Sequence, residues 1–386
     1  MQMADHTRPV LTIGADLSGL TVGRLLTNNG IANIVFEVSP PERSQGFAIS
    51  LHDWGCSRLL EALGGLSLRT VTKAVAPDRF IGAVMRANRN ALRAWMADYG
   101  DDELDVRYGH RLKNISGSVV NMQAVFENGA EYHGSVVIAA DRVHSAVRSQ
   151  VLPHIVPEVL PMVAYHGEFQ VSREEYDRHV RPLIGNANIL AGVGDGFNTP
   201  ITVCNITKIQ VHLDWSYSRP ARGENDPLFN AKAPENQARD LPLALLEELA
   251  SLQLAEPWAQ YINPETIQQH SVFHWISWCV YMPPDDALRA VQADVVFIGD
   301  AWHAMPIFSG EGGNHALVDS VELAAAMVKE ANVERAVALY YERAVRRCQE
   351  AVRRSRLRFY VLHRPIAEWR DIARKRLAKE ALRQKY

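Results

Sequence analysis

Cysteine is scarce in this sequence, and no two cysteines have the spacing of a metal or redox site. The four cysteines, Cys56, Cys204, Cys279 and Cys348, are scattered over 386 residues. Zinc sites and dithiol redox centres need closely spaced pairs, and disulfide-stabilised domains need many more cysteines. We therefore expect four small, buried hydrophobic side chains in a reducing compartment, and no metal site.

Long apolar runs and an excess of one charge are also missing. No run approaches the roughly 20 residues that cross a bilayer, and the polar first eight residues lack the apolar segment of a secretory signal. Lys and Arg number 41 against 44 Asp and Glu, for a net charge of −3. We expect a cytoplasmic protein without an integral membrane segment, long enough for two domains or for one domain with a large insertion.

The N-terminal part has the pattern of a β-α-β dinucleotide-binding unit. Residues 10–13 predict a strand, residues 14–19 a turn into a helix, and residues 34–37 a second strand with an acidic end. Such a unit places a diphosphate at the helix N-terminus and the carboxylate on ribose hydroxyls. The candidate cofactor-binding residues here are Gly14, Ala15, Ser18, Gly19 and Glu37.

One residue of this unit departs from the Gly-x-Gly-x-x-Gly fingerprint. Asp16 stands where the middle glycine allows the backbone to approach the diphosphate closely. A carboxylate adds bulk there, and its repulsion of a phosphate charge costs on the order of 1–4 kcal/mol. Asp16 therefore argues against ordinary dinucleotide binding, unless its side chain turns away or meets a cation.

Two later strand ends carry further polar residues. Residues 136–141 predict a buried strand that ends in Asp141, and residues 295–298 predict another, followed by Gly299 and Asp300. A loop rich in glycine comes next and gives a flat ligand access to backbone N–H groups. We expect the following helix to begin near Asn314, because asparagine is a good N-cap.

These segments together resemble the FAD-dependent aromatic hydroxylase family, the single-component flavoprotein monooxygenases. The resemblance is carried by Gly-Asp-Ala-Trp-His…Pro…Gly-Glu-Gly-Gly-Asn at 299–314, by Ala-Asp-Arg-Val-His-Ser-Ala-Val-Arg at 140–148, and by the first β-α-β unit. It implies an α/β fold: a Rossmann-like dinucleotide-binding domain with an inserted β-sheet substrate domain and C-terminal helices. The discontinuous FAD-binding domain then comprises residues 1–156 and 286–386, and the substrate-binding domain residues 157–285.

The resemblance also implies roles for individual residues. Asp300 is expected to hold the ribityl chain, the glycine loop to cradle the isoalloxazine ring, and Asp319 to complete the motif. The family needs no acid–base dyad, so no residue is assigned as catalytic with certainty; Pro306 is expected over the ring, and His303 is expected to orient the loop. The cofactor-binding candidates added in this way are Arg43, Arg89, Asp141, Asp300, Pro306, Gly310, Gly312, Gly313 and Asn314.

Two more positions depart from the family pattern. Arg142 replaces the glycine after Asp141, and Ile307 replaces a second proline. Either Arg142 neutralises Asp16 as a paired substitution, or the two positions drifted independently after cofactor binding relaxed. The sequence leaves both explanations open.

Residues from about 162 to 278 are rich in strand patterns and in aromatic and imidazole side chains. These side chains form either the wall of an apolar substrate pocket or ordinary core, and His166 stands where relatives often have an arginine. The pocket candidates are Tyr165, His166, His212, Trp215 and Trp275. Residues 341–386 are helical and carry 15 Lys and Arg against 5 Asp and Glu. Their apolar spacing favours packing within the molecule over nucleic-acid binding.

The resemblance implies a FAD-dependent monooxygenase. NAD(P)H reduces the flavin, oxygen adds as a C4a-hydroperoxide, and an apolar or aromatic small molecule is hydroxylated or epoxidised, plausibly in secondary metabolism. A second hypothesis is a non-redox member of the same fold, a cyclase, isomerase or ligand-binding protein with altered or lost FAD binding. We expect a small organic substrate, no nucleic-acid partner, and a monomer or weak dimer.

Overall fold

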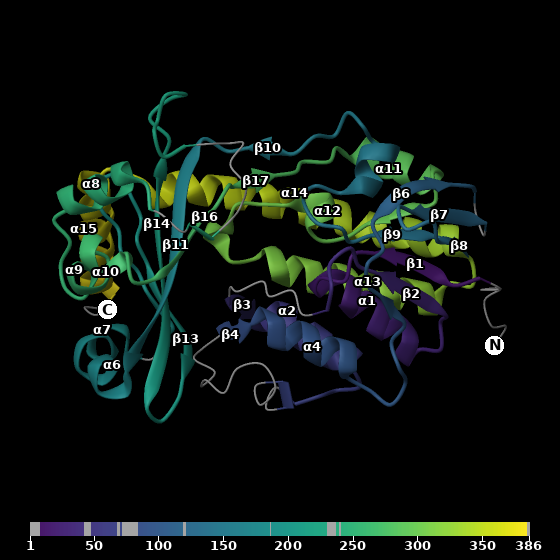
Figure 1. Cartoon of the computed structure of the whole chain (residues 1–386), viewed down its shortest axis with the longest axis horizontal. Coiled ribbons are helices and arrows are strands. Elements are labelled where there is room, and N and C mark those ends of the chain that lie inside the picture. The colour runs from purple at the N-terminus through teal and green to yellow at the C-terminus, as the bar shows by residue number, and fades with distance from the viewer. Residues whose placement is uncertain are drawn as a thin grey trace. The chain divides into compact units, whose positions relative to one another are not determined.

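The computed structural model divides the chain into two compact units (Figure 1). The residues that it describes are 8–41, 48–67, 70–71, 84–118, 121–185, 187–229, 237–238 and 241–383. Unit 1 comprises residues 1–158 and 278–355, and unit 2 comprises residues 159–277 and 356–386. The last 31 residues thus group with unit 2, whereas the sequence assigned them to the FAD-binding domain. The division falls inside the long helix α14 (Val333–Leu362), which no sequence pattern marks as a boundary.

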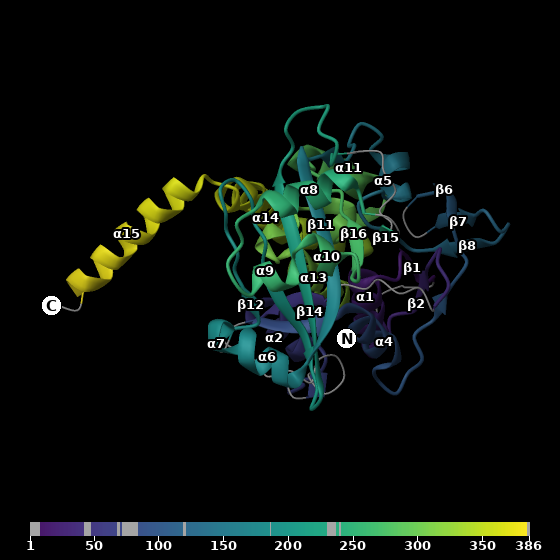
Figure 2. The same cartoon turned by 60° about the vertical axis from the view of Figure 1, so that its left-hand side comes forward.

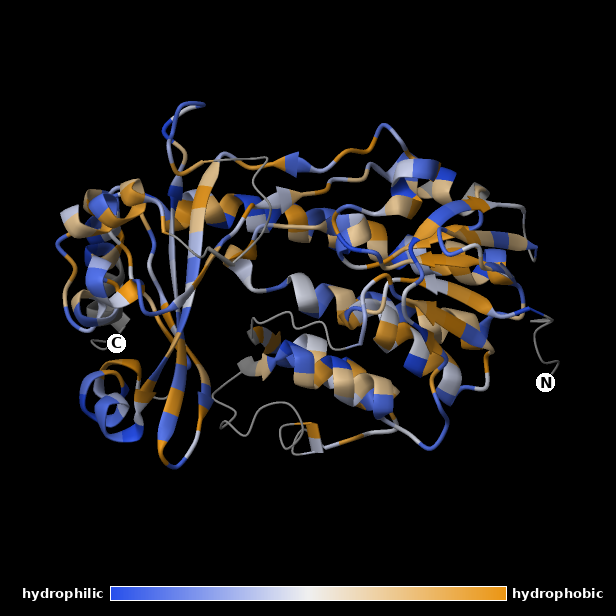
Figure 3. Cartoon of the chain, viewed as in Figure 1, coloured by the Kyte–Doolittle hydropathy of each residue, from blue (hydrophilic) through white to orange (hydrophobic). Residues whose placement is uncertain are grey.

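Unit 1 is built on a parallel sheet with the strand order β18-β9-β1-β2-β5. Its strands are β1 (Val10–Ile13), β2 (Asn33–Phe36), β5 (Val106–Arg107), β9 (Val137–Ala139) and β18 (Val295–Phe297). Every residue of β1, β9 and β18 is buried, and Figure 3 shows these strands as hydrophobic. Continuous burial of this kind is typical of parallel strands that are covered on both faces, as the sequence predicted.

Within the described residues, unit 1 also contains helices and small antiparallel sheets. The helices, apart from α14, are α1 (Leu17–Asn28), α2 (Asp53–Ala62), α4 (Arg89–Asp98), α5 (Ala146–Val151), α11 (Pro284–Gln292), α12 (Asp300–His303) and α13 (Gly312–Lys329). The antiparallel strands are β3 (Ala48–His52) with β4 (Val84–Asn88), and β6 (Leu112–Ser116) with β7 (Met122–Phe126) and β8 (Glu131–Gly134). The β7–β8 hairpin turns at Asn128-Gly129, a dipeptide that is typical of tight hairpin turns.

The glycine-rich segment differs from its prediction. A short 3-10 helix (Ile307–Ser309) precedes α13, and α13 begins at Gly312 instead of Asn314. Asn314 does not cap the helix. Its side chain accepts the N–H of His52 at 2.7 Å and donates to the carbonyl of Ser50 at 2.8 Å, and so it ties α13 to β3.

Unit 2 contains an antiparallel sheet with the strand order β12-β13-β14-β11-β16-β15. Its strands are β11 (Met162–Ser172), β12 (Ile189–Leu190), β13 (Ile201–Ile206), β14 (Gln210–Pro220), β15 (Gln237–Ala238) and β16 (Ser271–His274). Its helices are α6 (Arg173–His179), α7 (Arg181–Ile184), α8 (Leu243–Ser251), α9 (Trp258–Tyr261), α10 (Pro264–Ile267) and α15 (Ile366–Arg383). The chain passes between the units at β10 (Glu158–Val159) and β17 (Trp278–Cys279).

The two C-terminal helices differ in burial. Helix α14 buries Tyr340, Tyr341 and Val352, as expected for a packed helix. Helix α15 has no buried residue between Ile366 and Lys375, and Figure 2 shows it extending away from the strands of unit 2. The expected intramolecular packing therefore holds for α14 but not for this part of α15. Within the described part of the chain, no helix has the length and apolar character needed to span a bilayer.

Candidate functional site

The glycine turn after β1 has the shape that the sequence predicted. Gly14 has a φ of +106°, and a Cβ atom there would lie 2.3 Å from the carbonyl oxygen of Ala140. A Cβ on Gly19 would lie 1.8 Å from the carbonyl oxygen of Gly14. Only glycine fits at either position, because the turn must lie against the loop after β9 and the helix must lie against the turn.

Glu37 follows β2 and holds the same turn from its other side. Its buried carboxylate accepts the N–H of Ala15 at 2.9 Å and the N–H of Ser39 at 3.0 Å. Glu37 therefore supports the backbone of the dinucleotide loop. The ribose contact expected of this residue stays a prediction.

Asp16, the departure from the fingerprint, is held by arginines. It is only 5% exposed and is the N-cap of α1, where its side chain accepts the N–H of Leu17 at 2.8 Å. Arg89 forms a two-nitrogen contact with its carboxylate, and Arg142 Nε lies 3.3 Å from its Oδ2. Burial raises the pKa of Asp16, but the charges of Arg89 and Arg142 outweigh burial and lower the pKa to about 2.

These ion pairs agree with the paired substitution, the first of the two explanations that the sequence left open. The contact between Asp16 and Arg142 that a paired substitution requires is present. Two partners of Asp16 were not predicted: Arg89, which was expected to reach the cofactor, and Arg93, whose Nε lies 3.9 Å from Asp16 Oδ1. Residues four apart lie on one face of a helix. The spacing of Arg89 and Arg93 in α4 could therefore have indicated that both arginines reach the same carboxylate.

Arg142 and Asp141 shape the loop after β9. Arg142 has a φ of +67°, a left-handed conformation that explains why the family has glycine there. Asp141 Oδ2 accepts the N–H groups of Ala146 and Val147, at 2.7 and 3.2 Å, and so holds the start of α5. Burial raises the pKa of Asp141.

Asp300, the first residue of α12, lies within electrostatic reach of this arginine group. Asp300 is exposed to solvent, but the protein atoms around its carboxylate still raise its pKa. The charges of His303, Arg89 and Arg142 act to lower this pKa. The structure therefore brings together the loop after β1, the loop after β9 and the residue predicted to hold the ribityl chain.

His303 bonds Asp319, which also holds the backbone of Gly299, and the role of His303 in orienting the loop stays a prediction. His303 is 1% exposed, and its Nε2 lies 2.6 Å from Oδ2 of Asp319, which also accepts the N–H of Gly299 at 2.8 Å and a hydrogen bond from Arg347. Burial opposes the imidazolium, but Cys348 and Asp319 favour it and raise the pKa of His303 well above its usual value. His303, Asp319 and Cys348 have the spacing of metal ligands, but the adjoining guanidinium of Arg347 already neutralises the carboxylate.

Two glycines at the start of α13 and just before it would make only ordinary van der Waals contacts if they carried a Cβ atom. A Cβ atom on Gly310 would meet nothing nearer than 3.7 Å, and on Gly312 nothing nearer than 3.9 Å. Gly310 is left-handed, with a φ of +64°, and Pro306 is buried, with its carbonyl accepting a hydrogen bond from Ser355. A Cβ atom on Gly313 would lie 3.6 Å from the Ile49 side chain, and one on Gly299 would lie 2.9 Å from the Ser18 hydroxyl. Arg43 lies outside the described residues.

The pocket candidates of unit 2 lie on different faces of its sheet. Tyr165 and Trp215 belong to the hydrophobic core and are 4% and 0% exposed, which agrees with the core-packing alternative. His166 and His212 alternate with core residues of β11 and β14 and so point to the other face. There His166 Nδ1 lies 3.1 Å from the hydroxyl of Ser216. Trp275 follows β16 and is half-buried.

A parallel sheet with a glycine turn, acidic strand ends and an inserted antiparallel sheet is the architecture of a flavin-dependent hydroxylase. The chain is 80% identical to FAD-dependent monooxygenase vrtH from Penicillium aethiopicum, in an alignment that covers 100% of each protein. It is 56% identical to FAD-dependent monooxygenase adaC from Aspergillus niger, over 98% of this chain and 99% of the relative. Klebsiella pneumoniae HpxO, solved with FAD and uric acid, matches with a TM-score of 0.70 and 20% identity, over 92% of this chain and 89% of HpxO. No family model matches.

The chain belongs to the FAD-dependent monooxygenases and is an oxidoreductase. The expected family and the expected flavoprotein hydroxylase fold are both confirmed, the second by the likeness to HpxO. The two departures at Asp16 and Arg142 are therefore features of a flavoenzyme and need an explanation that keeps FAD in place.

Proposed function

We propose that this monooxygenase binds FAD along the carboxyl edge of the unit 1 sheet and oxygenates an apolar or aromatic small molecule. The observation that supports the proposal is the convergence of Gly14, Glu37, Asp141 and Asp300, which follow β1, β2, β9 and β18. Because these strands are parallel, their carboxyl ends lie at one edge of the sheet. Ligands of open α/β sheets bind at this edge, where the strand order reverses.

The residues at this edge fit FAD, with Asp16 as the one point of conflict. Arg89 and Arg142 supply cations for a diphosphate, and Asp300 offers a carboxylate that can accept hydrogen bonds from ribityl hydroxyls. Bound FAD, once reduced by NAD(P)H, supplies oxygen activation at flavin C4a. The chain itself has to orient the ring, exclude water and position the substrate.

Unit 2 is the proposed substrate-binding domain. The sheet face opposite its core carries His166 and Ser216, which form a hydrogen-bonded pair. An imidazole held in this way can orient a phenolic hydroxyl or a carbonyl group of a ring compound. HpxO, whose fold is similar, was solved with uric acid, a flat ring compound with carbonyl groups. We accordingly propose hydroxylation or epoxidation of a ring compound in secondary metabolism.

The purified protein tests the proposal directly. Bound oxidised flavin gives absorption bands at about 370 and 450 nm. A panel of hydroxylated aromatic compounds should stimulate NADPH or NADH oxidation, and labelled dioxygen should place one oxygen atom in the product. Flavin without oxygen incorporation would contradict the proposed reaction, and protein that takes up no FAD would contradict the proposed cofactor site.

The non-redox alternative rested on Asp16, Arg142 and Ile307. The structure removes part of that argument, because Asp16 is paired with arginines and does not stand as an isolated negative charge. The relatives at 80% and 56% identity are FAD-dependent monooxygenases. Oxygen incorporation distinguishes the two hypotheses, since a cyclase or isomerase adds no oxygen atom.

A further inference from the structure

The Asp16 carboxylate engages the groups that a dinucleotide diphosphate needs. It accepts the first N–H group of α1, from Leu17, and it holds the guanidinium groups of Arg89 and Arg142. Backbone N–H groups at a helix N-terminus and arginine side chains are the donors that commonly bind diphosphates. One side chain of the protein therefore already occupies both kinds of donor.

The location of this group is where a ligand is expected in such a sheet. Asp16 lies in the loop after β1 and Arg142 in the loop after β9, and β9 and β2 flank β1 on opposite sides. The ion pair thus joins the two loops at the point where the strand order reverses, which is the binding crevice of open α/β sheets.

The charges favour replacement of the carboxylate by a stronger anion. Arg89, Arg93 and Arg142 share the single Asp16 carboxylate, and Asp300 adds one more negative charge within electrostatic reach. Three guanidinium groups therefore lie around the Asp16 carboxylate, with the Asp300 carboxylate farther away. A diphosphate carries two negative charges, so it neutralises the arginines better than Asp16 does. Arg89 and Arg142 are also partly exposed, at 24% and 29% of their side chains, and a ligand can reach them.

We propose that the Asp16 carboxylate is a tethered competitor for the diphosphate of FAD: it occupies Arg89, Arg142 and the start of α1, and it releases them when the cofactor binds. This inference rests on the proposed placement of FAD. The diphosphate of FAD then replaces the Asp16 carboxylate on the same donors, so Asp16 does not prevent FAD from binding. The residue at position 16 determines the affinity and the association rate of FAD.

Asp16→Asn is the decisive variant, because asparagine caps a helix as well as aspartate does but carries no charge. FAD and ADP should each bind about five- to 150-fold more tightly to the variant than to the wild type. Riboflavin, which has no diphosphate, should bind both proteins equally. Glu127→Gln, which removes one charge from an exposed ion pair of the same unit, is the matched control and should leave all three affinities unchanged. The affinities can be measured by quenching of flavin fluorescence and, for ADP, by displacement of FAD.

The kinetics of FAD binding separate competition from simple repulsion. A competitor that must leave first slows association, so the gain of Asp16→Asn should appear in the association rate. A gain confined to the dissociation rate would mean that Asp16 only repels the bound diphosphate, and would overturn the inference. Unchanged or weaker FAD binding by a folded Asp16→Asn protein would overturn it too. Absence of FAD binding by both proteins would instead overturn the proposed cofactor site, and the inference with it.

Arg142 gives a second, independent test. If Arg142 passes from Asp16 to the diphosphate, Arg142→Gly should weaken FAD binding about tenfold even in the Asp16→Asn background. If the removal of Arg142 has no effect once Asp16 is neutral, Arg142 serves only to neutralise Asp16, and the proposed exchange is wrong for that residue. Glycine is a safe choice at this position because the backbone is left-handed there.

Discussion

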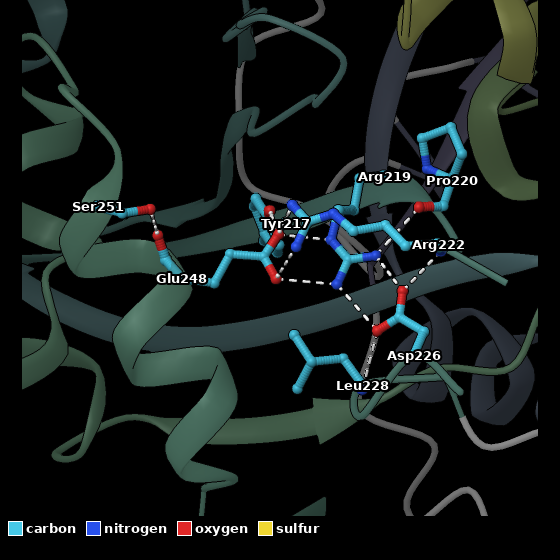
Figure 4. A network of polar contacts seen from close by, with 8 residues as sticks. All are labelled: Tyr217, Arg219, Pro220, Arg222, Asp226, Leu228, Glu248 and Ser251. Atoms are coloured by element: carbon cyan, nitrogen blue, oxygen red, sulfur yellow. Dashed lines mark hydrogen bonds and ion pairs between the residues drawn. The ribbon is translucent and has the colours of Figure 1, made fainter. Parts of the chain in front are cut away.

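Each unit contains a cluster in which arginines pair with buried carboxylates, and the two clusters differ in the number of arginines per carboxylate. In unit 2, Arg219 bonds Asp226 and Glu248, Arg222 also bonds Glu248, and Tyr217 donates to the same carboxylate (Figure 4). Two cations there face two anions. In unit 1, three arginines share the carboxylate of Asp16.

The arginines of the two clusters also differ in exposure to solvent. The side chain of Arg219 is 4% exposed, and Asp226 also accepts the N–H groups of Arg222 and Leu228, at 2.8 and 3.0 Å. Hydrogen bonds with Arg219 lower the pKa of Asp226 although burial raises it. In the unit 2 network the two carboxylates and Arg219 are buried and paired with one another, so the network stabilises the fold. The arginines that share Asp16 are partly exposed and so are suited to bind an anion, and their mutations should change ligand affinity more than stability.

The largest effect should come from Arg219→Ala. This change leaves the buried Asp226 without its cation and leaves Glu248 with only the exposed Arg222, so it should lower the free energy of unfolding by about 3–5 kcal/mol. The affinity for FAD should not change in protein that remains folded. Arg222→Ala is the matched control, because Arg222 bonds the same Glu248 but is 66% exposed; it should alter stability by less than about 0.5 kcal/mol. Urea unfolding measures the free energy of unfolding of both variants. Equal losses of stability in Arg219→Ala and Arg222→Ala would show that burial does not distinguish the two clusters.

Asp300→Ala should give the next largest effect, on ligand binding and not on stability. Each charge-assisted hydrogen bond lost to FAD removes about 1.5–3 kcal/mol, which corresponds to roughly ten- to 150-fold weaker binding. The side chain is exposed, so the free energy of unfolding without FAD should change little. Asp285→Ala, an exposed aspartate in the first turn of α11, is the control. Full flavin content in folded Asp300→Ala protein would remove Asp300 from the cofactor site.

The smallest effect concerns the pH dependence of the Asp16 cluster. The pKa of Asp16 falls from 3.8 to about 2 in the folded protein. Ionised Asp16 therefore adds about 2 kcal/mol of stability, fully present above pH of about 4 and lost as the pH falls through about 2. The arginines facing it stay charged throughout, whereas Asp300 titrates nearby, so wild type and Asp16→Asn must be compared at each pH. A stability difference that stays constant down to the lowest pH at which both proteins fold would contradict the pairing.

Local patterns predicted the features that depend on neighbouring residues. The strand before Gly14, the helix after it, the acidic end of β2 and the Asn128-Gly129 hairpin could all be predicted from single segments. Each of these depends on backbone geometry or on alternation over a few residues. The motif at 299–314 likewise led to the right family.

Contacts between distant segments could not be predicted in the same way. Asn314 has a good N-cap side chain, but the backbone of β3, more than 260 positions earlier, provides better partners. Tyr165 and Trp215 belong to the core because of the face of β11 and β14 on which they lie, and composition cannot decide that face. Arg93 joins the Asp16 cluster only because α4 lies beside the glycine turn.

The sequence by itself determined the dinucleotide loop and the strand ends, because glycine positions and strand ends follow from local sterics, and the resemblance of its motifs indicated the family. It also identified Asp16 and Arg142 as departures, and it proposed their pairing as one of two explanations. Only the tertiary structure decided that Asp16 meets three arginines, because the strength of an ion pair depends on distance and burial between loops that are far apart along the chain.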